Sequence, residues 1–179
     1  MRKGRVHAHV HPPGGRGQAV ICLSRSEKET ALIAQTLGEK LQKGDTVLLY
    51  GELGAGKSVF ARGCARALGV TGDMASPSFT LMQSYRGDAC SVNHFDLYRL
   101  SGPDELYYAG LEEQIGADAV SLIEWPQQAD VCPDRRVEVD IERADAYEAR
   151  RIEINLFGME DRAEEIYGAL TRFKAEKTN

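Results

Sequence analysis

The chain has 179 residues, of which 42% are apolar, and its formal net charge is −5. This length predicts one domain with short appendages, and no apolar run approaches the ~20 residues that a membrane-spanning helix needs. The acidic balance argues against binding of nucleic acid by phosphate neutralisation. We therefore expect a soluble, cytoplasmic protein that has no membrane attachment and that meets any RNA through another component.

The N-terminal segment predicts a leader followed by the first elements of the domain. Residues 1–18 lack the apolar stretch of a secretory signal, and their PPGGRG sequence buries too little surface to fold. Residues 19–23 then predict a short strand. Ser26 and Glu29 form a capping-box signature, so a helix is expected to begin there.

The motif GELGAGKS at residues 51–58 fits the P-loop pattern G-x-x-x-x-G-K-[ST]. In such a loop backbone N–H groups surround phosphate oxygens, a lysine reaches the β- and γ-phosphates, and a hydroxyl binds Mg²⁺. The flanks agree, because residues 45–50 predict a buried strand and residues 58–68 show helical spacing that ends at Gly69. We predict ATP and Mg²⁺ as cofactors, bound by Glu52, Leu53, Gly54, Ala55, Gly56, Lys57, Ser58 and Val59.

A loop rich in hydroxyl groups follows the P-loop helix. Residues 72–85 contain Ser76, Ser78 and Thr80 around a proline, and then enter an apolar strand. Nucleotide switches present such hydroxyls or amides to Mg²⁺ and the γ-phosphate, but a turn whose hydroxyls cap backbone groups fits equally well. We include Thr80 among the cofactor-binding candidates.

Two carboxylates lie at the ends of predicted strands. Asp96 ends a strand within residues 90–97 whose side chains alternate outward and inward, and Glu124 follows the apolar run 119–123. Hydrolysis by a P-loop protein also requires a held Mg²⁺ and an oriented water. We predict that Lys57, Asp96 and Glu124 are catalytic. The metal is expected to be bound by Ser58 and Glu124. Asp96 is assigned to water positioning or base catalysis, although the sequence leaves the roles of the two acids interchangeable.

The C-terminal third predicts an antiparallel extension of the sheet. Residues 135–143 and 149–157 alternate with period two, which is typical of a hairpin with a solvated, charged face. A single amphipathic helix is expected at 159–174. Strands and helices that alternate around a P-loop predict an α/β, three-layer P-loop NTPase-like fold with a mostly parallel sheet. The expected divisions are a disordered leader at 1–18, the ATPase domain at 19–157, and a C-terminal helix and tail at 158–179.

Several motifs in order give the chain a specific likeness: GELGAGKS, FARG, SPSFTL, HFDLYRL with PDEL, and LIEWPQ. Between about Glu29 and about Asn155 it resembles the TsaE (YjeE) family, small bacterial P-loop ATPases required to make threonylcarbamoyladenosine in tRNA. The resemblance implies ATP hydrolysis in a complex with the TsaB and TsaD proteins, in which TsaD transfers the group to the adenosine and this protein meets tRNA only indirectly. It also implies residues 54–58 on the phosphates, Ser58 and Glu124 on magnesium, Asp96 as catalytic carboxylate and residues 76–80 as a switch. Ser58 and Ser78 replace threonines that are common in the family, and each keeps the hydroxyl.

Two other functions stay open on the sequence. A small-molecule or nucleoside kinase would share the P-loop but would need an arginine-bearing lid, for which Arg135 and Arg136 are the candidates. A nucleotide sensor that does not hydrolyse its ligand is the other alternative. A GTPase is disfavoured because the chain has no guanine-reading N-K-x-D motif. Trp125 is interpreted as filling the edge of the core.

Overall fold

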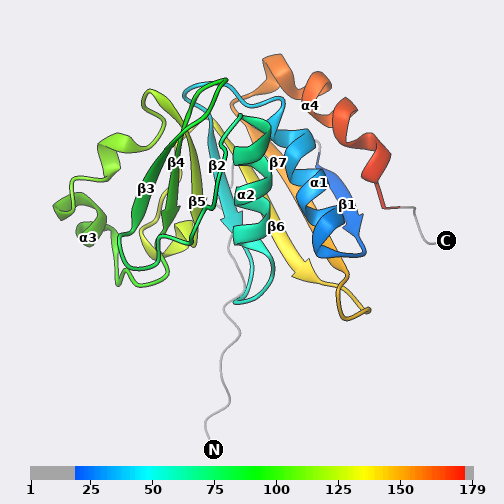
Figure 1. Cartoon of the computed structure of the whole chain (residues 1–179), viewed down its shortest axis with the longest axis horizontal. Coiled ribbons are helices and arrows are strands. Elements are labelled where there is room, and N and C mark those ends of the chain that lie inside the picture. The colour runs from blue at the N-terminus through cyan, green and yellow to red at the C-terminus, as the bar shows by residue number, and fades with distance from the viewer. Residues whose placement is uncertain (1–18, 176–179) are drawn as a thin grey trace, which may run out of the picture.

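The computed structural model describes residues 19–175, so the predicted leader at 1–18 lies outside the described residues. The described chain forms a seven-stranded mixed sheet in the order β1-β7-β6-β2-β5-β4-β3 (Figure 1). Its strands are β1 (Val20–Ser24), β2 (Thr46–Tyr50), β3 (Met82–Arg86), β4 (Ser91–Asp96), β5 (Ala119–Glu124), β6 (Arg136–Arg143) and β7 (Arg150–Phe157).

The centre of the sheet is parallel and its two sides are antiparallel. Strands β6, β2, β5 and β4 run parallel to one another, whereas β3 pairs antiparallel with β4, and β7 pairs antiparallel with both β6 and β1. The predicted α/β fold class is therefore confirmed, including the C-terminal hairpin of β6 and β7. Because β2, β4, β5 and β6 point the same way, their carboxyl ends share one edge of the sheet.

Helices cover the two faces unequally. The helices are α1 (Glu27–Gly38), α2 (Lys57–Ala67), α3 (Pro103–Tyr108) and α4 (Ala163–Leu170). Helices α1 and α2 lie side by side on one face and α4 packs beside α1, while α3 lies at the β3 side of the molecule (Figure 1). Four 3₁₀ turns complete the described elements: η1 (Glu112–Gln114), η2 (Pro126–Gln128), η3 (Glu160–Arg162) and η4 (Thr171–Phe173). Within residues 19–175 no helix is long and apolar enough to cross a bilayer.

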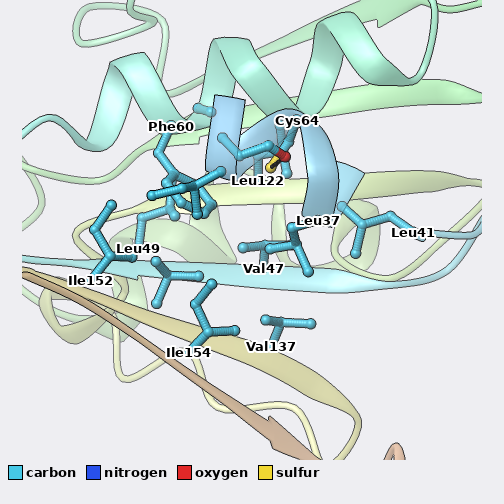
Figure 2. Close-up of a cluster of buried hydrophobic side chains, with 14 of the residues drawn as sticks. Leu37, Leu41, Val47, Leu49, Phe60, Cys64, Leu122, Val137, Ile152 and Ile154 are labelled. Atoms are coloured by element: carbon cyan, nitrogen blue, oxygen red, sulfur yellow. Dashed lines mark hydrogen bonds between the residues drawn. The ribbon is translucent and has the colours of Figure 1, made fainter. Parts of the chain in front are cut away.

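The main core lies between the sheet and α1, α2 and α4. Figure 2 shows side chains from α1 and α2 directed at those of the strands, and Phe60, Leu49, Leu122 and Ile152 are among its fully buried members. A smaller cluster on the other face contains Leu48, Phe95, Leu97, Leu100, Leu106, Ile123 and Ala129. Alternate residues of β2 and β5 therefore enter different cores, as the period of a strand buried on both faces requires.

Helix α1 begins at the predicted cap. The Ser26 hydroxyl accepts a hydrogen bond from the Glu29 N–H at 3.2 Å, which satisfies one of the free N–H groups of the first turn. The Glu29 carboxylate accepts from the Arg25 N–H, one residue before the position that a standard capping box uses. The cap is confirmed, with this shift in the returning bond.

Three sequence predictions are corrected by the structure. The strand predicted at 90–97 does not alternate, because it is buried from Val92 to Asp96 between β3 and β5. The segment before it, β3, is a largely exposed edge strand instead of an apolar one. The predicted charged face of the hairpin is solvated only toward the end of β6, where Glu142 is exposed; at its start Arg136 and Glu138 are buried and paired at 2.7 Å.

The helix predicted at 159–174 is also divided. It consists of η3, α4 and η4, with tighter 3₁₀ turns at both ends of the short α-helix. Its apolar side nevertheless faces inward, since Ile166 and Leu170 are fully buried in the main core and Phe173 packs against it.

Candidate active site

The P-loop connects β2 to α2 at the carboxyl edge of the sheet. Gly51 has φ +136°, and a Cβ there would lie 2.5 Å from the Ile141 carbonyl oxygen of β6. Gly56 caps α2 in the left-handed region with φ +112°, and a Cβ there would have no neighbour within 4 Å. Gly51 therefore requires glycine both for its backbone conformation and for the close approach of β6, whereas Gly56 requires it for backbone conformation alone.

Lys57 is the first residue of α2 and is only 4% exposed. Its Nζ donates to the carbonyl oxygens of Gly51 at 2.7 Å and Glu52 at 2.9 Å, and it lies 3.8 Å from the centroid of the Trp125 ring. Burial lowers the pKa of Lys57 from its ordinary value, while the carboxylates of Glu124 and Asp96 act in the opposite direction. The ammonium group is thus bound to neutral carbonyl acceptors. A phosphate is a stronger acceptor and can replace them as its hydrogen-bond partner.

Glu124 joins the P-loop to the neighbouring strands. It ends β5 and is 3% exposed, and its Oε2 accepts a hydrogen bond from the Ser58 hydroxyl at 2.9 Å. Its second oxygen, Oε1, lies 2.9 Å from Nε2 of His94 on β4. The structure therefore brings the two predicted metal ligands into direct contact.

The distance between Ser58 Oγ and Glu124 Oε2 fits a magnesium site. Mg²⁺ binds oxygen at about 2.1 Å in octahedral geometry, so two adjacent ligands lie about 3.0 Å apart. No cluster of three or more His, Cys, Asp or Glu side chains suited to a metal is present in residues 19–175. This pair therefore suits a cation that is bound by few protein groups and completed by phosphate and water oxygens.

Asp96 ends β4 beside Glu124 but has its own set of partners. Its Oδ2 accepts from the hydroxyls of Ser76 and Ser78, both at 2.7 Å, and its Oδ1 accepts from the Tyr98 N–H at 3.1 Å. Asp96 is 5% exposed, so these bonds compensate the loss of solvent around a carboxylate. The loop predicted as a switch is thereby attached to the predicted catalytic acid.

A cavity of about 560 Å³ unites these groups. The predicted residues in its wall run from Leu53 to Val59 and include Ser76, Ser78, Asp96, Glu124 and Trp125. Trp125 is only partly buried, with φ +59°, and its ring lies 4.9 Å from that of Tyr98 between centroids, in a tilted arrangement with 52° between the ring planes. It therefore contributes both to the smaller core, as predicted, and to the cavity wall.

Other predicted residues lie apart from the cavity wall. Thr80 is exposed in the turn after Pro77, and Glu52 contributes its carbonyl group to Lys57 and not its side chain to the wall. The proposed kinase arginines are also remote. Arg136 begins β6 at the edge opposite the P-loop and pairs with Glu138, and Arg135 donates to the Gly158 carbonyl and to Asp161.

Part of the cavity wall was missed by sequence reasoning: Glu27, Thr30, Tyr98, Arg143, Tyr147, Glu148 and Arg150. Most of these residues belong to the start of α1 or the turn between β6 and β7, which reaches the same edge as the P-loop (Figure 1). Arg150 even donates from Nε to the Ala55 carbonyl at 2.8 Å. No single motif predicts these residues. Their position follows only once β6 is known to run parallel to β2, because the turn between β6 and β7 then lies at the carboxyl edge of the sheet.

Comparisons with known proteins agree on one family. The family model described as "Threonylcarbamoyl adenosine biosynthesis protein TsaE" matches residues 24–152. The chain is 41% identical over 103 residues to the Rickettsia conorii protein named tRNA threonylcarbamoyladenosine biosynthesis protein TsaE, which covers 57% of this chain and 58% of that protein. Proteins of the same name from Haemophilus influenzae and Treponema pallidum are 37% and 35% identical, and the chain covers 71% and 89% of their lengths.

The fold comparison gives the same result. The crystal structure of Bacillus subtilis YdiB superimposes with a TM-score of 0.68 at 29% sequence identity, covering 87% of this chain and 95% of that one. The match of the family model over most of the chain, together with these relatives, shows that the chain belongs to the TsaE family of threonylcarbamoyl adenosine biosynthesis proteins.

Proposed function

We propose that this protein is the ATP-binding and ATP-hydrolysing component of the machinery that installs threonylcarbamoyl on the adenosine next to the tRNA anticodon. It acts with TsaB and TsaD and does not transfer the group itself. Membership of the TsaE family supports the pathway. The observation that carries the ATPase activity is the contact of Ser58 Oγ with Glu124 Oε2 at 2.9 Å, at the first turn of α2 and beside Asp96.

Each group at this edge has a distinct task in the proposal. The P-loop amides and the Lys57 ammonium bind the phosphates, and the N-terminus of α2 adds the positive end of its dipole. Ser58 and Glu124 hold Mg²⁺, which when bound neutralises charge on the phosphate oxygens. Asp96 orients the attacking water in this proposal; its position in the cavity wall beside the Ser76 and Ser78 loop supports that task.

The charge of the chain supports a role without direct binding of tRNA. A net charge of −5 repels a polyphosphate instead of attracting it. The cavity wall includes the exposed aromatic rings of Tyr98 and Tyr147, and aromatic residues are typical of protein contacts. Contact with partner proteins is therefore the more consistent interpretation of this surface.

The deciding experiment measures phosphate release from ATP by this protein alone, with TsaB and TsaD, and with a panel of kinase acceptors. We expect release to be slow alone and to rise when both partners are present. If the protein binds nucleotide but releases no phosphate in any mixture, the ATPase proposal is wrong and the nucleotide sensor is the remaining interpretation. Transfer of phosphate to an acceptor would establish the kinase, against which the burial and pairing of Arg136 already count.

A further inference from the structure

His94 is a buried polar residue that the proposed mechanism does not use. It lies on β4, is 1% exposed, and its Nε2 lies 2.9 Å from Glu124 Oε1. Because side chains alternate along a strand, His94 and Asp96 share one face of β4. That face is the one on which Glu124, the register partner of Asp96, meets Ser58 of α2.

The backbone around Glu124 is already fixed by neighbouring strands. The Leu97 N–H donates to the Glu124 carbonyl at 3.1 Å, and the Trp125 N–H donates to the Leu49 carbonyl at 3.3 Å. What remains adjustable is the side chain of Glu124, whose torsions decide where its two oxygens point. Ser58 is bound by one of these oxygens and His94 by the other, so the carboxylate is held at both ends.

The hydrogen bonds of His94 differ from those of an ordinary buried polar residue. Its Nδ1 is buried and has no hydrogen-bond partner within residues 19–175. The adjacent Asn93, which points to the opposite face, accepts from the Ser84 hydroxyl at 2.7 Å and donates to the Gln114 carbonyl at 3.2 Å. Asn93 thus connects structural elements, whereas the ring of His94 forms its one described hydrogen bond to Glu124.

We propose that His94 is a positioning residue for the metal site. Its Nε2–H donates to Oε1 of Glu124 and so holds Oε2 toward Ser58 and toward the cation that accompanies the nucleotide. The assignment of the proton to Nε2 follows from the partner, since an ionised carboxylate can only accept. Partners of this kind orient a metal ligand without touching the metal, and their loss typically weakens metal binding about 10- to 100-fold. This inference rests on the proposed function.

The test compares the His94→Phe and His94→Gln variants of the full chain. Phenylalanine keeps the size of the ring and removes the donor, while glutamine restores an N–H at a similar reach. Asn93→Leu is the matched control, because it removes a buried polar group from the same strand on the other face. The primary readout is Mn²⁺ affinity in the presence of a non-hydrolysable ATP analogue, followed by electron paramagnetic resonance, with thermal unfolding of each variant alongside.

We expect His94→Phe to weaken Mn²⁺ binding by about 10-fold or more, while affinity for the analogue in EDTA stays within about 3-fold of the parent protein. His94→Gln should recover most of the Mn²⁺ affinity. The control Asn93→Leu should lower the unfolding temperature but leave the Mn²⁺ affinity unchanged. If His94→Phe does not fold, His94→Leu serves as the variant without a donor.

Two results would overturn the inference: unchanged Mn²⁺ affinity in a folded variant without the donor, or a folded His94→Gln that is as weak as His94→Phe. Failure of the proposed function gives a different pattern. In that case the parent protein itself would show no Mn²⁺ binding that depends on the nucleotide, and Glu124→Ala would change nothing.

Discussion

Asp96 and Glu124 are register partners at the ends of the adjacent parallel strands β4 and β5, yet within residues 19–175 their carboxylates share no hydrogen-bond partner. Glu124 contacts the P-loop hydroxyl of Ser58, whereas Asp96 is bound by the Ser76 and Ser78 loop. The sequence left the roles of the two acids interchangeable. This division of contacts supports Glu124 as the metal ligand and Asp96 as the residue that orients water.

The first prediction concerns Asp96→Asn. The substitution keeps an acceptor oxygen for Ser76 and Ser78 but removes the charge and basicity that water activation needs. We expect turnover of ATP to fall about 10²- to 10⁴-fold, which is the usual range for loss of a general base, with little change in nucleotide affinity. Steady-state phosphate release with the partner proteins, together with calorimetric binding of ATP, measures both quantities. A loss confined to affinity would place Asp96 in binding instead of in the chemical step.

The second prediction concerns Lys57→Ala. The buried ammonium is the one side-chain cation at the first turn of α2, and its loss removes charge-assisted hydrogen bonds to phosphate. Such bonds contribute about 1.5–3 kcal/mol each, so nucleotide affinity should fall by roughly 100-fold or more. Calorimetric titration with ADP and ATP provides the measurement.

Lys43→Ala is the control for Lys57→Ala. Lys43 is exposed near the start of β2 and pairs with Asp118 at 3.0 Å, away from the cavity. The Lys43→Ala variant should bind nucleotide with the same affinity as the parent protein. Retention of the parent affinity by Lys57→Ala would contradict the phosphate role.

The P-loop unit could be predicted from the sequence because its signals are local. The aliphatic run of β2, the glycines and the helical spacing after Lys57 are neighbours in the chain, and together they dictate strand, turn and helix. The Ser26 cap and the hairpin of β6 and β7 were predictable for the same reason. In each case a few adjacent residues satisfy the backbone or alternate with the right period.

The remainder of the site depends on strand order, which no local pattern encodes. Thr30 and Arg150 reach the P-loop only because β1 and β7 extend the sheet beyond β6. The contact of His94 with Glu124 likewise requires β4 to lie directly beside β5. The buried pair of Arg136 and Glu138 was predicted as solvated because alternation of charges indicates a face but not what covers it.

The third prediction concerns thiol reactivity. Cys132 is exposed, while Cys22 and Cys64 are fully buried and Cys90 is partly so. Burial raises the pKa of Cys22 to about 11, and it also raises those of Cys64 and Cys90. Since the thiolate is the reactive form and a raised pKa reduces its fraction at pH 8, one thiol should react quickly with Ellman's reagent in the native protein.

The Cys132→Ser variant identifies that thiol. It should lose the fast phase, and the remaining thiols should become reactive on unfolding in guanidinium. A fast phase that persists in Cys132→Ser would mean that one of the three remaining thiols is accessible in the native protein.

The fourth prediction compares two glycine-to-alanine substitutions that add the same atoms in different surroundings. Helices α1 and α2 approach closely at Gly63, where a Cβ would lie 2.6 Å from the Ala34 Cβ and 2.8 Å from the Ala31 carbonyl oxygen. Gly168 in α4 is exposed and a Cβ there would meet nothing within 4 Å. Overpacking costs about 1–3 kcal/mol, whereas alanine at an open helical site gains about 0.4–1 kcal/mol. We therefore expect Gly63→Ala to lower the free energy of unfolding and Gly168→Ala to raise the free energy of unfolding. Urea denaturation measures both changes. Because α2 carries Lys57 and Ser58 at its start, Gly63→Ala should also weaken nucleotide binding, while Gly168→Ala should leave nucleotide binding unchanged. Stabilisation by both substitutions would contradict the close approach of α1 and α2, on which the position of the P-loop depends.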